Sequence, residues 1–272
     1  MNRKLQRREM LQWSSSALLL NQFWPGWANS QEKAPAEFSF IVVNDLHFQT
    51  EKCPTFFARV MKQMNDQIEK PRFVLVAGDL AQDGTEKELS GIKESLKKLQ
   101  MPYFVTPGNH DYTPKNDRTI YEKLFPKSLN YYFEEGGITW LIIDSTEGTK
   151  YNNTTINKDT LVWLDATLPK LDKTKPMVLL THFPLAAKVT YCPKNAEEVL
   201  KRFRDYPLRA VFSGHFHGTT ENESGGVLLS TNVCCAISRN NHNSQKEKGY
   251  LLVTVKNGKL KKKFVAVETT IL

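Results

Sequence analysis

The chain has 272 residues, of which 40% are hydrophobic and 24% charged, and its formal net charge at pH 7 is +8. This composition excludes a disordered or fibrous protein and supplies enough apolar material for one large domain. No run of about 18 apolar residues occurs, so no stable membrane anchor is expected. The positive charge is mild for this length. We therefore expect no nucleic-acid partner, although a basic surface favours small anionic substrates.

The N-terminal segment is typical of an export signal. Residues 1–28 combine a basic start, a short apolar patch and small residues at a plausible cleavage point. The pair Arg7-Arg8 within this segment resembles a twin-arginine signal. We predict an exported bacterial protein, periplasmic or extracellular, with a polar linker at 29–36 and one domain over 37–272. The alternatives are a basic tail or an uncleaved tether.

The first part of the domain alternates buried strands with helices. Apolar runs predict strands over 38–43, 73–77 and 102–105. Helical spacing of apolar residues predicts helices over 54–69 and 86–99. Pro54 near the start of the first helix and Pro71 beyond its end favour these limits.

The second part adds hairpins to the same alternation. A β-hairpin is predicted from 131–133 and 139–143, which are joined through two glycines. Helices follow at 158–168 and 197–203, and strands at 177–180 and 210–212. Two more hairpins are predicted around the glycine-containing turns at 225–226 and 257–258.

Polar residues follow five of the predicted strands at the point where each strand ends. These segments are 45–47, 78–79, 108–111, 181–182 and 214–217. Five of the six histidines lie in them, beside aspartate and asparagine. Because strand ends in α/β sheets gather at one edge, we expect the five segments to meet at one site.

The residue types at these strand ends are those of a metal site. Mixed oxygen and imidazole ligands suit divalent Mn, Fe, Zn or Co. The absence of cysteine from the set argues against a closed structural zinc site. The carboxylates Asp45 and Asp79 together with several imidazoles exceed the needs of one ion. Two ions that share a bridging carboxylate, at a separation of roughly 3.5–4 Å, account for the set better.

The order of these motifs resembles that of the calcineurin-like metallophosphoesterase superfamily. The motifs are Asp45-x-His47, Gly78-Asp79, Gly108-Asn109-His110-Asp111, His182 and Gly214-His215-x-His217. Every element is present and in the right order. The resemblance implies an α/β (α+β) fold. It would be a four-layer sandwich of two mixed β-sheets flanked by helices, with a dinuclear metal site at the strand ends.

The resemblance also implies a role for each residue. One metal ion would be bound by Asp45, His47 and His217. The second would be bound by Asn109, His182 and His215, and Asp79 would bridge both ions. Hydrolysis would follow in-line attack by a metal-bridging hydroxide. Asn109 and His110 would bind substrate, His110 would act as the general acid, and Asp111 would orient His110.

Residues that depart from the superfamily pattern indicate which branch of the superfamily the chain resembles. His47 and Gln82 stand where purple acid phosphatases have a glycine and a tyrosine ligand, which argues against that branch. Residues 78–84 resemble the cyclic-nucleotide phosphodiesterase branch, whereas Phe183 replaces the second histidine of its His-His-Pro motif. A phosphodiesterase is favoured, with a phosphomonoesterase or a nucleotide diphosphatase as the alternatives. A non-catalytic scaffold or a metal-storage protein is disfavoured because His110 is retained.

Several further residues have open assignments. Substrate choice is expected to depend on the loops at 112–128, 145–160 and 186–195. Asp144 is interpreted either as a support for the site or as a turn residue. Four aromatic residues are candidates for the pocket wall: Tyr112, Trp140, Trp163 and Tyr191. The chain has four cysteines, and a disulfide is possible between Cys53 or Cys192 and one of the adjacent pair Cys234 and Cys235. The oligomeric state is left undetermined.

Overall fold

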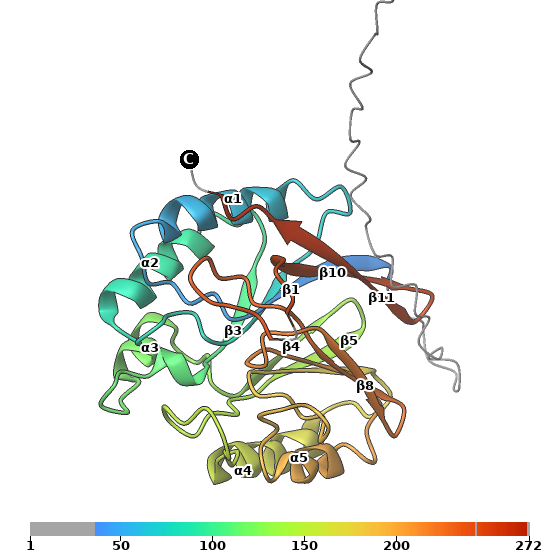
Figure 1. The fold of residues 1–272 in the computed structure, drawn as a ribbon. Helices are drawn as coiled ribbons and strands as arrows, with labels where there is room; N and C mark the ends of the chain where they lie inside the picture. Colours follow the sequence, from blue (N-terminus) through green and yellow to red (C-terminus); the bar gives the residue numbers. More distant parts are fainter. Residues whose placement is uncertain (1–35, 243, 271–272) are drawn as a thin grey trace, which may run out of the picture.

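The computed structural model describes residues 36–242 and 244–270 (Figure 1). The expected export signal at 1–28 lies outside the described residues, as does the expected linker except for its last residue. In the described residues, no helix is long and apolar enough to cross a membrane. Two β-sheets, one of five strands and one of six, form the centre of the domain.

The first sheet has the strand order β11-β10-β1-β2-β3. Its parallel part consists of β1 (Phe38–Val43), β2 (Val74–Ala77) and β3 (Tyr103–Thr106). Every residue of β1 and β2 is buried, which is why their sequences are continuous apolar runs. The hairpin of β10 (Lys248–Lys256) and β11 (Lys259–Val267) adds two antiparallel strands beside β1.

The second sheet has the order β4-β5-β6-β7-β9-β8. Its parallel strands are β5 (Ile138–Ile142), β6 (Met177–Thr181), β7 (Leu208–Ser213) and β9 (Val227–Thr231). The edge strands β4 (Tyr131–Glu135) and β8 (Thr220–Ser224) are antiparallel to their neighbours. Both sheets are therefore mixed, as the family resemblance implies.

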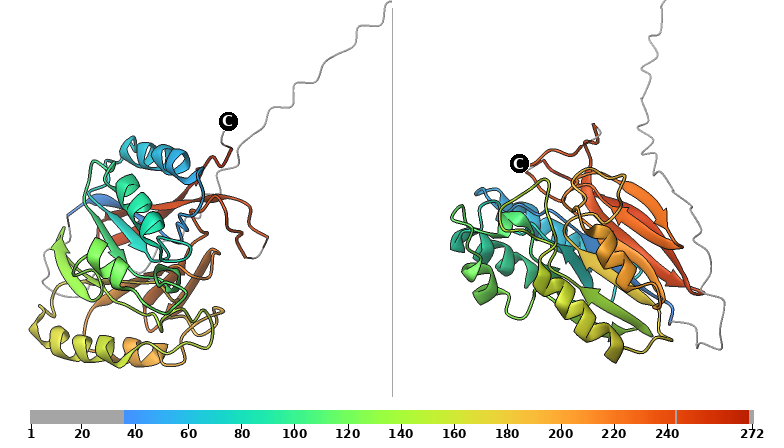
Figure 2. Two further views of the ribbon diagram at one scale, coloured as in Figure 1. Left: turned by 90° about the vertical axis from the view of Figure 1, so that its left-hand side faces the viewer. Right: turned by 90° about the horizontal axis from the view of Figure 1, so that it is seen from below.

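The helices cover the outer faces of the two sheets (Figure 2). The first sheet is covered by α1 (Cys53–Asn65), α2 (Glu86–Leu96) and α3 (Thr119–Leu124). The second is covered by α4 (Lys158–Thr167), the short 3-10 turn at Leu168–Lys170 and α5 (Ala196–Arg202). Between the sheets lies an aromatic core that contains Phe40, Phe73 and Trp140. The predicted four-layer sandwich is confirmed.

The structure differs from the sequence prediction at helix ends and at two aromatic residues. The helix α1 ends at Asn65 rather than at 69, because Ile68 does not continue its buried face and is 91% exposed. The helix α3 is short and was not predicted. Trp140 lies in the core between the sheets, and Trp163 lies on α4 and packs against the core beneath that helix, so neither lines the pocket. All four cysteines are free thiols.

Candidate metal centre

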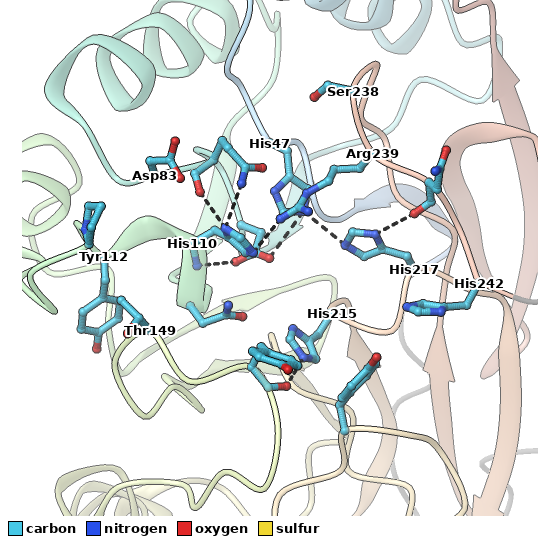
Figure 3. Close-up of a pocket in the computed structure, with 17 residues that line it drawn as sticks. His47, Asp83, His110, Tyr112, Thr149, His215, His217, Ser238, Arg239 and His242 are labelled. Carbon is cyan, nitrogen blue, oxygen red and sulfur yellow. Dashed lines mark hydrogen bonds and ion pairs between the residues drawn. The ribbon is translucent and has the colours of Figure 1, made fainter.

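The five polar strand ends converge where the carboxyl edges of the two sheets adjoin (Figure 3). The first sheet supplies the residues that follow β1, β2 and β3, and the second supplies those that follow β6 and β7. His182 joins the two edges, since its Nδ1 donates to the carbonyl oxygen of Ala77 at 2.9 Å. The backbone N–H of His215 donates to both carboxylate oxygens of Asp45, at 2.9 and 3.1 Å. The site is therefore built across the junction between the sheets.

Asp79 lies between two groups of candidate ligands. Its Oδ2 is 3.5 Å from Nε2 of His47, and its Oδ1 is 3.4 Å from Nε2 of His182. The carboxylate is 1% exposed and therefore nearly closed to bulk water. Each oxygen thus faces a different imidazole. This arrangement lets one carboxylate bind two ions.

Two groups of ligand atoms can each hold an ion. The first consists of Asp45, His47, Asp79 and His217, and the second of Asp79, His182 and His215. Within each group the ligand atoms lie within 4.8 Å of one another. The Oδ1 of Asn109 is 3.2 Å from Nε2 of His182 and so adds a neutral oxygen to the second group. The structure brings together all seven residues expected from the sequence.

The outer hydrogen bonds of three histidines select the nitrogen that faces the centre. Nδ1 of His182, Nε2 of His215 and Nδ1 of His217 each contact a backbone carbonyl, at 2.9, 2.8 and 3.1 Å. A carbonyl only accepts, so each of these nitrogens carries the hydrogen. The other nitrogen of each ring faces the centre, and in the neutral ring it presents the lone pair that a metal ligand needs. The donor set therefore fits two divalent cations.

Most of these residues have an unusual backbone conformation. Five of the seven have positive φ angles: Asp45, His47, Asp79, His215 and His217. Positive φ costs free energy in non-glycine residues and persists where the surrounding structure enforces it. Here it turns the side chains inward directly after the strands. Five of the twelve non-glycine residues with positive φ in the described part of the chain are thus candidate ligands, and such strain is typical of functional sites.

Three glycines leave the space that these side chains occupy. A Cβ on Gly108 would lie 2.1 Å from Oδ1 of Asp79, and one on Gly214 would lie 2.6 Å from Oδ2 of Asp45. A Cβ on Gly78, whose φ is +78°, would lie 2.5 Å from Nδ1 of His182. All three distances are shorter than real Cβ contacts. The glycines of the sequence motifs are therefore required by close approach, and only Gly78 also by its φ.

The charges of the buried groups suit cation binding. Burial lowers the pKa of His47 and of His215 to about 3, so both rings are neutral and can act as ligands. Burial raises the pKa of Asp79, but the imidazoles of His182, His110 and His47 outweigh it and bring the value down to about 2. Burial by itself would raise the pKa of Asp45 and lower that of His217. The ion pair between the two outweighs burial, so the pKa of Asp45 is lowered and that of His217 is raised. The carboxylates are therefore ionised at neutral pH.

His110 lies beside the centre, but Asp111 does not orient it. The backbone N–H of His110 donates to Oδ1 of Asp79 at 2.9 Å, and its Nδ1 is 2.6 Å from the carbonyl oxygen of Gln82. The carboxylate of Asp111 instead accepts from the backbone N–H groups of Ala81 and Gly108, at 2.9 and 2.8 Å. The expected orienting role of Asp111 is therefore wrong. Asp111 braces two loops, and the Gln82 carbonyl fixes the ring of His110.

The contacts of Asp144 decide between the two interpretations of this residue. Its carboxylate pairs with Arg118 and accepts hydrogen bonds from the backbone and hydroxyl of Thr146. It is thus a turn residue, which was one of the two interpretations of the sequence.

A cavity of about 720 Å³ opens over the centre. Tyr112, Thr149, Tyr151 and Tyr191 line it, from the three loops expected to control substrate choice. The sequence analysis missed another part of the wall between β9 and β10, which consists of Ser238, Arg239, Asn240 and His242. The connection over 232–247 is longer than about 12–15 residues, and loops of that length are uncommon unless they are functional. Its length could therefore have identified it as part of the site.

Comparison with known proteins agrees with this geometry. The family model described as calcineurin-like phosphoesterase matches residues 38–219, which contain every candidate ligand. The chain belongs to the calcineurin-like phosphoesterase family. It is accordingly a metal-dependent phosphoesterase.

The individual relatives that the chain matches share less than a third of their aligned residues with it. The chain is 28% identical to a 3',5'-cyclic-nucleotide phosphodiesterase of Nostoc sp., over 65% of this chain and 68% of that protein. It is 27% identical to a probable glycerophosphodiester phosphodiesterase of Arcobacter nitrofigilis, over 62% of this chain and 64% of the relative. A dimetal phosphatase from Danio rerio has the same fold, with a TM-score of 0.62 and 15% identity. That match covers 87% of this chain and 100% of the Danio rerio chain.

Proposed function

We propose that this enzyme hydrolyses phosphodiesters with two divalent ions, which are manganese, iron or zinc. The observation that carries the two-ion assignment is the position of Asp79, whose two oxygens face separate groups of ligands. The diester preference is supported by the relatives named as cyclic-nucleotide and glycerophosphodiester phosphodiesterases. A cavity of about 720 Å³ also leaves room for substituents on both sides of a phosphate.

The proposed ligand sets follow the two groups in the structure. The first ion would be bound by Asp45, His47 and His217, the second by Asn109, His182 and His215, and both by Asp79. When bound, such a pair of ions supplies a nucleophile at neutral pH and stabilises charge on the phosphoryl oxygens. Asn109 contributes no charge of its own, so it limits repulsion of an anionic substrate.

His110 is proposed to protonate the leaving group. Its Nδ1–H is held by the carbonyl of Gln82, so the proton that it transfers must leave from Nε2, which faces the cavity. The backbone N–H of His110 donates to Asp79, and this contact ties the acid to the metal centre. His110 and Asn109 are also proposed to bind the substrate phosphate.

A phosphomonoesterase and a nucleotide diphosphatase would use the same residues. They differ from a phosphodiesterase in the charge of the substrate. The non-catalytic scaffold remains disfavoured, because the two ligand groups and His110 are complete in the structure.

The proposed function predicts that metal-loaded protein cleaves bis-p-nitrophenyl phosphate faster than p-nitrophenyl phosphate. Chelation should abolish both reactions, because the attacking group depends on the ions. Initial rates are measured after chelation and after separate addition of manganese, iron and zinc. A higher rate with the monoester would contradict the diester assignment. No turnover of either ester by folded, metal-loaded protein would contradict the phosphoesterase mechanism.

We also propose that the chain is exported, on the basis of the Arg7-Arg8 pair in its N-terminal segment. Fractionation of a bacterial host tests this proposal. Wild-type protein is expected outside the cytoplasm, and a variant with both arginines changed to lysine is expected to stay inside. Equal distribution of the two proteins would contradict a twin-arginine signal.

A further inference from the structure

The connection between β9 and β10 places an arginine over the metal centre. Arg239 lines the cavity together with Ser238, Asn240 and His242 from the same segment. Figure 3 shows its side chain reaching toward His47 and His110. The family match ends at residue 219, so this segment lies beyond it. Arg239 is thus a cation of the cavity that the family motifs do not include.

The side chain of Arg239 forms one hydrogen bond with the described residues. Its Nη2 lies 2.8 Å from Nε2 of His110. A guanidinium has five N–H donors and no acceptor, so His110 must be the acceptor in this contact. No carboxylate in the described part of the chain forms an ion pair with Arg239, and its buried Nε has no partner there. The side chain therefore lacks the anion that normally neutralises a half-buried arginine.

The main chain around Arg239 is fixed to the site. Nζ of the buried Lys248 donates to the carbonyl oxygen of Arg239 at 2.6 Å. Nδ1 of His217 donates to the carbonyl oxygen of Asn240 at 3.1 Å, and the N–H of His242 donates to the carbonyl oxygen of His217 at 2.9 Å. The segment is thus attached to one of the proposed metal ligands. This attachment presents the guanidinium in a defined position.

We propose that Arg239 binds a non-bridging oxygen of the substrate phosphate and releases Nε2 of His110 when it does so. The planar fork of a guanidinium matches two phosphate oxygens, and its charge is independent of pH. The exchange gives Nη2 of Arg239 an anionic acceptor in place of the neutral ring of His110. It also frees the lone pair of Nε2 of His110, which can then take from water the proton that the general-acid step transfers to the leaving oxygen. The inference rests on the proposed phosphoesterase function and adds a substrate-binding residue to it.

The test compares Arg239→Gln, Arg239→Lys and the control Arg204→Gln, which removes an arginine from an exposed position outside the cavity. With bis-p-nitrophenyl phosphate, KM of the glutamine variant should rise about 10- to 100-fold, as expected when one or two charge-assisted hydrogen bonds are lost. The lysine variant should lie between it and the wild type, because it keeps the charge without the fork. The control should match the wild type.

A second measurement does not require turnover. Affinity of the metal-loaded proteins for inorganic phosphate is measured by calorimetry, together with their metal content. Phosphate binding should weaken by a similar factor in Arg239→Gln while the metal content stays unchanged. Unchanged KM and phosphate affinity in that variant would overturn the inference. Absence of turnover in the wild type would instead reject the proposed function, and the phosphate titration would still test Arg239.

Discussion

Replacement of Asp79 by asparagine is expected to lower phosphodiester hydrolysis by about a thousandfold or more. The bridging position requires two equivalent anionic oxygens, and an asparagine offers one neutral oxygen and one N–H₂ donor. Loss of the bridge removes transition-state stabilisation of several kcal/mol, and each 1.36 kcal/mol is a factor of ten in rate. The fold should persist, because Asn can still accept the backbone hydrogen bond from His110 that Asp79 accepts at 2.9 Å.

Metal analysis distinguishes this explanation from simple unfolding. Wild-type protein should bind two ions per chain, and Asp79→Asn one or none, with a similar circular-dichroism spectrum. Gly108→Ala should also lose metal although it changes no ligand, because its Cβ would lie 2.1 Å from Oδ1 of Asp79. The control Asp165→Asn changes a carboxylate that pairs with Arg202 outside the site and should keep both ions. Two ions per chain in Asp79→Asn would contradict the bridging role.

Replacement of His110 by alanine is expected to have an effect that depends on the leaving group. General acid catalysis contributes about 10²- to 10⁴-fold when the leaving group is a basic alkoxide. A p-nitrophenolate needs little protonation, so the loss with bis-p-nitrophenyl phosphate should be about tenfold or less. The metal content should not change, because His110 belongs to neither ligand group.

The two kinds of substrate are compared in the same preparation. The alkyl substrate is a cyclic nucleotide or a glycerophosphodiester, whichever the wild type hydrolyses, and kcat is measured for both substrates and both proteins. Equal losses of kcat would show that His110 acts on binding or structure rather than on the leaving group. The control Asp111→Asn should retain the difference between substrates, since Asp111 contacts the backbone of Ala81 and Gly108 rather than the ring of His110.

Local sequence patterns were sufficient for most of the secondary structure. The strand Phe38–Val43 is buried on both faces, and a continuous apolar run records that burial directly. The helix Glu86–Leu96 begins at a capping box formed by Thr85 and Glu88, which is a local interaction. Helix ends were less predictable. An apolar side chain such as Ile68 continues the helical pattern in the sequence although it is exposed in the fold.

The sequence by itself determined the family, the two-sheet fold and the seven candidate ligands, because their types and order follow from short motifs at strand ends. Only the tertiary structure decided that three of those ends belong to one sheet and two to the other. It also shows that the partner of the His110 ring is the carbonyl of Gln82 and not Asp111, and that Nη2 of Arg239 lies 2.8 Å from Nε2 of His110. These contacts join residues that are distant in sequence or engage the backbone. No local pattern encodes them, since they depend on how the sheets pack and where an irregular connection returns.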